Sequence, residues 1–260
     1  MNPIRIPLRR NDVAELLYVE RQSLSDSDYS VDEALQALNM PGQLCLGWYE
    51  GDALVGFLSC FETYTPAGAR LELDMLGVLP GFRNRGIATA LIRHAVEYAA
   101  ANGLAEARAV VRCDNAASLT AFAKAGLARR ECVSMLIWNQ PATQSACPGH
   151  EVARTTAQVS GRPYLSGQVL TLAACGAVAS KVTAIAVTTL AYRGCWLEDL
   201  EGPAVADRTR LATAAGVWAV GTGLDEAGML VPLADTELIT SLLEAGWHRS
   251  GDFHILGWQA

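Results

Sequence analysis

The sequence is poor in the patterns that build metal sites, disulfide frameworks and secretion signals. Its 260 residues include seven cysteines and four histidines, which form no CxxC, HxxxH or HExxH pair. An odd number of scattered cysteines is typical of reduced thiols inside a cell. The amino-terminal segment MNPIRIPLRRNDVAELL has no uninterrupted apolar run, which argues against a secretory signal. These absences predict a cytoplasmic protein that uses no metal.

Positive charge is also scarce, since 20 lysines and arginines stand against 27 acidic residues, for a net charge of −7. An acidic chain is a poor partner for nucleic acid and tolerates a cationic small molecule or peptide better. The most apolar stretch, residues 169–192, carries Lys181 near its middle and is rich in Thr and Val. It therefore predicts two buried strands and a turn, with no membrane-spanning helix.

Residues 1–139 have the periodicities of a mixed α/β domain. The expected order is a strand at 4–8, two helices between 11 and 40, three strands between 43 and 78, a helix at 86–103, and then strand, helix and strand up to Trp138. Residues 140–150 are rich in Pro, Ser and Thr and read as a linker to a second domain at 151–260.

The second domain resembles the first. Residues 89–138 placed on 209–258 without a gap are identical at 15 of 50 positions, including Trp138 with Trp258. A period this long indicates a duplicated domain. The second copy has no room for the two early helices, so we expect a truncated copy in a tandem α/β protein with a mixed, mostly antiparallel sheet.

The loop VLPGFRNRGIATAL, residues 78–91, is where the two copies differ most. The second copy replaces its arginines and Gly86 while keeping the surrounding scaffold. The first turn of a helix offers unpaired N–H groups and partial positive charge, and a glycine lets a phosphate approach them. The loop has neither the Walker pattern nor the dinucleotide GxGxxG pattern. We therefore expect a pyrophosphate to bind across residues 83–89 of the first copy alone.

This loop resembles a known family. R83-N84-R85-G86-I87-A88 fits the [R/Q]-x-x-G-x-[G/A] motif of the GNAT superfamily of acyl-CoA-dependent N-acetyltransferases. The helix that starts at N115-A116-A117-S118 and ends at A125-G126-L127 is similar to that family's N-x-x-A…Y…GF helix. The order of elements in the first domain matches as well, and the second domain then reads as a degenerate copy.

The resemblance implies transfer of an acetyl group from acetyl-CoA to a primary amine of a small molecule or peptide. It implies that backbone amides hold the coenzyme A pyrophosphate, that main-chain groups of the preceding strand hold pantetheine and polarise the thioester carbonyl, and that Asn115 bonds the pantetheine arm. The implied cofactor-binding residues are Leu76, Gly77, Val78, Arg83, Asn84, Arg85, Gly86, Ile87, Ala88, Thr89, Asn115, Ser118 and Phe122.

Two acidic residues are candidates for the general base. An alkyl ammonium with a pKa near 10 must lose a proton before it attacks. Glu72 and Asp74 lie two apart on one expected strand and so face the same side. In some members of the family a glutamate six residues before the valine is the base, and Glu72 stands six before Val78. We favour Glu72, with Asp74 second; an ordinary solvent-facing acid is the alternative for both.

Phe122 occupies the position of the family's usual general acid, a tyrosine. A phenyl ring cannot donate a proton, so water, Ser118, Cys113 or Tyr64 substitutes, or the thiolate leaves unassisted. The remaining alternative is a non-catalytic acyl-CoA-binding module. The second domain either replaces a subunit, in a monomer or homodimer, or forms an acidic, aromatic wall of the acceptor pocket. That wall would consist of Trp196, Glu198, Asp199 and Glu201.

Overall fold

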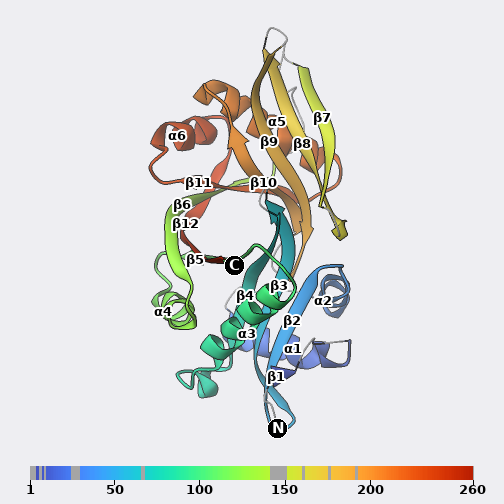
Figure 1. The fold of residues 1–260 in the computed structure, drawn as a ribbon, viewed down its shortest axis with the longest axis vertical. Helices are drawn as coiled ribbons and strands as arrows, with labels where there is room; N and C mark the ends of the chain where they lie inside the picture. The colour runs from blue at the N-terminus through green and yellow to red at the C-terminus, as the bar shows by residue number, and fades with distance from the viewer. Residues whose placement is uncertain are drawn as a thin grey trace. The chain divides into compact units, whose positions relative to one another are not determined.

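The computed structural model describes residues 4–5, 8, 10–24, 30–65, 68–140, 151–159, 162–174, 177–190 and 193–259 (Figure 1). All but the first residue of the predicted linker lie outside these ranges. The chain divides into two compact units. The first comprises residues 1–130, 188–191 and 254–260, and the second comprises 131–187 and 192–253.

The predicted order of elements in the first half is confirmed. The elements are β1 (Ile4–Arg5), α1 (Val13–Ser23), α2 (Val31–Leu38), β2 (Gln43–Glu50), β3 (Ala53–Thr65), β4 (Gly68–Val78), α3 (Ile87–Ala101), β5 (Glu106–Arg112), α4 (Ala116–Ala125) and β6 (Ala128–Trp138). Short 3₁₀ turns at Arg10–Asp12 and Pro80–Phe82 precede α1 and follow β4.

Local sequence explains several of these boundaries. Ser30 and Glu33 form a reciprocal capping box that starts α2. Gly51 takes a φ of +63°, which an L side chain rarely adopts, and so permits the tight hairpin between β2 and β3. Asn115 caps α4, and Gly126 ends it in the left-handed conformation.

The first unit's sheet has the strand order β1-β2-β3-β4-β5-β12. The β4–β5 pairing is parallel and covers only Arg70–Leu73 with Glu106–Ala109. Beyond it β4 continues to Val78 and β5 to Arg112 without pairing to each other. On its other side, β4 has a bulge against β3 that leaves Asp74 without a register partner. The carboxyl end of β4 thus has one unpaired backbone edge.

The second unit is built from strands followed by a βαβαβ segment. Its elements are β7 (Glu151–Val159), β8 (Arg162–Ala174), β9 (Ala177–Thr188), β10 (Arg193–Glu201), α5 (Val205–Gly221), β11 (Glu226–Pro232), α6 (Thr236–Glu244) and β12 (His248–Gln259). The sheet order is β6-β11-β10-β9-β8-β7. The described residues between 151 and 204 form strands and no helix, so the prediction of a truncated copy is confirmed.

The structure also fixes the register of the repeat on the strand before the loop. In the second unit the parallel ladder joins Gly194–Leu197 to Glu226–Met229, as Arg70–Leu73 joins Glu106–Ala109 in the first. The offset is therefore 120 residues on β11 and 124 on β10. Trp196 takes the position of Glu72, and Glu198 takes that of Asp74.

Each unit includes strand residues from the other half of the chain. Residues of β6 from 131 onward belong to the second unit, where β6 pairs antiparallel with β11 and buries Leu136 and Trp138 in its core. Residues of β12 from 254 onward belong to the first. The predicted boundaries, 1–139 and 151–260, treat each domain as one continuous stretch and do not include this exchange.

The first unit's core lies between the sheet and its helices. Helix α3 packs on β3 and β4 (Figure 1). A separate cluster joins α1 and α2 to Phe57 and also buries Leu190, from the short segment 188–191. No helix within the described ranges combines the length and hydropathy needed to span a membrane.

Candidate active site

A cavity of about 600 Å³ lies in the first unit, between the end of β4 and the first turns of α3 and α4. This is the size range of small-molecule sites. Its lining comprises Ser23, Leu24, Leu76, Val78, Phe82, Arg83, Asn84, Gly86, Ile87, Ala88, Thr89, Asn115, Ala117, Ser118, Thr120, Ala121 and Lys124. The cavity therefore brings together ten of the thirteen predicted cofactor-binding residues. Gly77, Arg85 and Phe122 are not among its lining residues.

The loop before α3 is shaped to bind an anion. Gly86 is the N-cap of α3 with a φ of +80°, and Asn84 also takes a positive φ, +63°. No side chain caps the helix, so its first N–H groups keep their capacity to donate. A Cβ built on Gly86 would meet nothing within 4 Å, so the backbone is open to the cavity. This geometry suits a pyrophosphate.

The two arginines of the loop brace its backbone. Arg83 donates from Nε to the carbonyl of Val78 at 3.1 Å and from Nη2 to the carbonyl of Ser23 at 3.3 Å. Arg85 donates to the carbonyl of Gly81 at 3.2 Å, and its guanidinium lies 4.9 Å from the Phe82 ring. Both side chains thus hold the loop in shape while adding positive charge beside it.

Helix α4 supplies one wall of the cavity. The side-chain oxygen of Asn115 accepts the N–H of Ser118 at 3.1 Å as a helix cap. Lys124, near the carboxyl end of the same helix, also lines the cavity and brings a positive charge to it. Phe122 is 3% exposed and packs in the core. Gly77 is buried as well, and a Cβ on it would meet the Phe57 ring.

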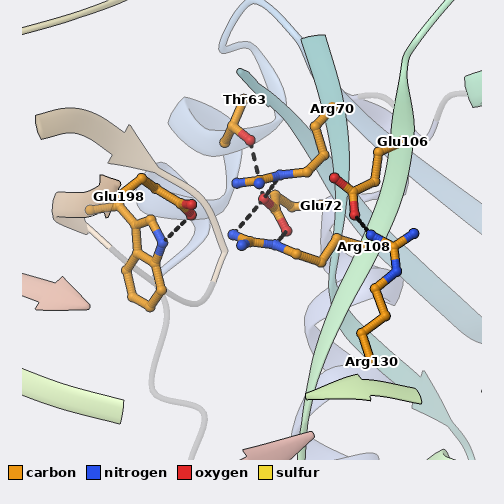
Figure 2. A network of polar contacts seen from close by, with 8 residues as sticks. Thr63, Arg70, Glu72, Glu106, Arg108, Arg130 and Glu198 are labelled. Carbon is orange, nitrogen blue, oxygen red and sulfur yellow. Dashed lines mark hydrogen bonds and ion pairs between the residues drawn. The ribbon is translucent and has the colours of Figure 1, made fainter. Parts of the chain in front are cut away.

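Glu72, the favoured base, lies in a buried ion-pair cluster (Figure 2). Its Oε1 accepts from Nε of Arg70 at 2.6 Å and from Oγ1 of Thr63 at 3.1 Å. Nε of Arg108 donates to its Oε2 at 2.9 Å, and Nη2 lies 2.8 Å from Oε1. Both carboxylate oxygens are therefore engaged within the protein. Glu106 pairs with Arg130 nearby in the same view.

Asp74, the second choice, lies at the β4 bulge and is half-buried. Burial raises the pKa of its carboxyl to about 6, a hydrogen bond from Thr189 opposes the rise, and the charge of Glu72 adds to it. Its Oδ2 is buried and has no hydrogen-bond partner among the described residues. Neither Asp74 nor Glu72 is among the lining residues of the cavity. A carboxyl with a pKa near neutrality is suited to proton transfer.

The equivalent place in the second unit is a shallower cavity of about 450 Å³. It is lined by Val205, Ala206, Thr236, Glu237, Thr240, Ser241 and Glu244. Arg208 pairs with Asp235 at 2.7 Å, and Oγ1 of Thr209 donates to Ser241 at 2.9 Å, so that α5 and α6 are tied together at their first turns. On β10, Nε1 of Trp196 donates to Glu198 at 2.8 Å (Figure 2).

Sequence reasoning missed seven residues that line the first cavity: Ser23, Leu24, Phe82, Ala117, Thr120, Ala121 and Lys124. Those on α4 share one helical face with the predicted Ser118, a spacing that could have identified them. Ser23 ends α1, far from the loop in sequence, and no local pattern points to it. Its Oγ is buried with no hydrogen-bond partner in the described part of the chain.

A model of the acetyltransferase (GNAT) family matches residues 11–127. No curated protein matches the sequence.

Several solved structures are similar over almost the whole chain. A tandem GNAT protein from the clavulanic acid biosynthesis pathway is 15% identical, with 98% of each chain covered and a TM-score of 0.57. A Pyrococcus horikoshii protein assigned as an acetyltransferase is 12% identical over 100% of this chain and 90% of its own, with a TM-score of 0.62. A GCN5-related N-acetyltransferase from Sphaerobacter thermophilus is 12% identical over 98% and 95%, with a TM-score of 0.60. These similarities confirm the predicted tandem fold.

Proposed function

We propose that this protein transfers an acetyl group from acetyl-CoA to a primary amine, and the match of residues 11–127 to the model of the acetyltransferase (GNAT) family supports the proposal. The acceptor is a small molecule or a peptide, and the negative net charge of the chain favours a cationic one. The observation that carries the proposal is the cavity in which the uncapped turn at Gly86 meets the unpaired end of β4.

The cavity offers groups suited to the phosphates, the pantetheine arm and the thioester of acetyl-CoA. The first-turn N–H groups of α3 receive the pyrophosphate, and the charge of Lys124 supports a phosphate group at the other side. The backbone edge of β4 from Leu76 to Val78 offers hydrogen bonds to pantetheine, since β5 does not pair there. A main-chain N–H directed at the thioester oxygen stabilises the negative charge that forms on it.

Asp74 is the proposed general base. The amine lone pair attacks the thioester carbon after the ammonium gives up a proton to Asp74, directly or through water. The carbon–sulfur bond then breaks, and the second proton of the attacking nitrogen passes through the Ser23 hydroxyl to the departing thiolate. A carboxyl with a pKa of about 6 is ionised at neutral pH and is still basic enough to take the proton. Glu72 has both oxygens engaged by arginines and Thr63, so its proposed role is to hold β4 and β5 together.

Ser23 is the proposed proton donor to the departing thiolate. Phe122 cannot donate and packs in the core, whereas Ser23 lines the cavity, and its buried Oγ has no hydrogen-bond partner among the described residues. Ser23 also lies against β4, because a Cβ on Gly77 would come within 3.2 Å of its Cβ. The thiol has a pKa near 8.5, so its departure is tolerable even without full proton transfer.

The test measures release of the CoA thiol over a panel of amines, together with acetyl-CoA affinity by calorimetry. Turnover with an amine, lost on Gly86→Glu, is the expected result. Binding of acetyl-CoA without turnover of any amine would instead favour a non-catalytic acyl-CoA-binding module. Absence of binding would overturn both functions. A cytoplasmic location and a monomer or homodimer complete the proposal.

A further inference from the structure

A short segment from the second half of the chain belongs to the first unit. Residues 188–191 begin at the last residue of β9, yet they group with residues 1–130. Leu190 is 1% exposed and packs in the cluster formed by α1, α2 and Phe57. Met75, the residue after Asp74, packs against the same cluster. The segment is therefore anchored beside the β4 bulge by a buried apolar side chain.

Thr189 joins this segment to the bulge. Its side chain is 3% exposed, and it forms a hydrogen bond with the Asp74 carboxyl. An ionised carboxylate only accepts hydrogen bonds, so the threonine hydroxyl is the donor in the form of Asp74 that can take a proton. The bulge leaves Asp74 without a register partner on β3, so the pleat alone does not fix where its side chain points.

We propose that Thr189 is a positioning residue for acetyl transfer, through which the second half of the chain completes the site of the first. This inference rests on the proposed function, because it assigns Thr189 to the base of that reaction. Its hydroxyl holds one carboxylate oxygen of Asp74 and leaves the other, which has no partner among the described residues, for the amine proton. The duplicated half thus supplies a functional group as well as a scaffold.

The groups around Asp74 set the expected direction of the effect. Glu72 on β4 and Cys60 on β3 interact with it electrostatically, and α1, which packs on β4, carries the buried Glu20. None of these groups is a cation. The hydrogen bond from the Thr189 hydroxyl is therefore the contact that stabilises the charged carboxylate and opposes the rise in its pKa caused by burial. Its removal raises the pKa of Asp74 further above 6.

The experiment compares Thr189→Val, which keeps the shape and removes the hydroxyl, with Thr189→Ser, which keeps the hydroxyl. We expect Thr189→Val to move the acidic limb of the pH profile of kcat/KM upward by about half a unit to one unit, which lowers kcat/KM at pH 6 about two- to fivefold. Thr189→Ser and the KM for acetyl-CoA are expected to stay near wild type. An unchanged profile in Thr189→Val would overturn the proposal.

A second measurement needs no turnover and separates this inference from the proposed function. The Asp74 carboxyl is titrated by carbon-13 NMR, with its signal assigned by its loss in Asp74→Asn. A higher pKa in Thr189→Val than in wild type supports the hydrogen bond, and equal values overturn the inference. If wild type acetylates no amine, the proposed function fails, and so does the role of Thr189 in that function. The titration still decides whether the hydrogen bond between Thr189 and Asp74 exists.

Discussion

The two halves of this chain build the same pocket scaffold and equip it in opposite ways. In the first unit the turn before α3 is opened by Gly86, and Lys124 adds positive charge. At the corresponding positions the second unit has Ala206 and Glu244, with a further acid at Glu237. An acidic cavity repels phosphate, so the charge of the second cavity as well as its shape is unfavourable to the ligand proposed for the first.

The helices show the same divergence. Arg208 and Asp235 occupy the positions of Ala88 and Asn115, and their ion pair joins α5 to α6 where the first unit keeps its cavity. The fold does not require the open loop, because the second unit forms the same ladder and helices without it. We therefore attribute the open loop to the proposed ligand site.

The largest expected effect comes from placing an acid at equivalent positions of the two loops. Gly86→Glu introduces charge and bulk against the pyrophosphate and should weaken acetyl-CoA binding by at least about 100-fold, measured by calorimetry. Ala206→Glu is the matched control and should change affinity less than about threefold. Gly86→Ala introduces the backbone strain of a positive φ without a charge, so its effect separates the strain from the charge of the glutamate. Comparable losses in the two glutamate variants would erase the distinction between the pockets.

The second contrast lies on the strand before the loop. In the first unit β4 carries Glu72 and Asp74, and at the equivalent positions of the second unit β10 carries Trp196 and Glu198. Asp74→Asn should lower kcat/KM about 100- to 1,000-fold, with acetyl-CoA affinity unchanged. Glu72→Gln should mainly destabilise, since it leaves two buried arginines without their carboxylate, by about 3–5 kcal/mol. Denaturant unfolding and steady-state kinetics measure both effects. Retention of full activity by Asp74→Asn would remove it as the base.

Asp74 also carries a stability prediction with a defined sign. Its pKa is raised on folding to about 6, so the ionised carboxylate destabilises the folded state. This destabilisation is absent below the ordinary carboxyl range and fully present above pH 6. Asp74→Asn should therefore raise the melting temperature at pH 7.5 and leave it unchanged at pH 3.5, as followed by scanning calorimetry. A lower melting temperature at pH 7.5 would contradict the burial argument.

Ser23 tests the acid step that Phe122 cannot perform. Ser23→Ala should lower kcat about three- to tenfold, because a thiolate leaves tolerably well without a proton. The loss should shrink with a thioester whose thiol is more acidic than that of CoA, since such a group needs no donor. An equal loss with both thioesters would assign Ser23 to packing.

The smallest effect belongs to the second unit. Arg208→Met should lower its stability by about 1 kcal/mol or less, because the ion pair with Asp235 is partly exposed. Turnover and acetyl-CoA affinity should stay at wild-type values. A drop in affinity would place Arg208 in a ligand site and break the comparison.

The sequence allowed prediction of the fold class, the element order of the first half and the loop at residues 83–89, because hydrophobic period and turn chemistry are local. It favoured Glu72 over Asp74 from spacing alone, since the arginines around Glu72 come from β4 and β5 and the bulge at Asp74 depends on the pairing with β3. It did not predict Ser23 or Thr189. Their places depend on packing between segments distant in sequence.

The central claim is one acetyl-CoA site per chain, in the first unit. Its most direct test is the binding stoichiometry of acetyl-CoA to the wild-type protein by isothermal titration calorimetry. The account predicts one molecule per chain, with no weaker second phase. Two molecules per chain, or one that persists in Gly86→Glu and disappears in Ala206→Glu, would contradict it.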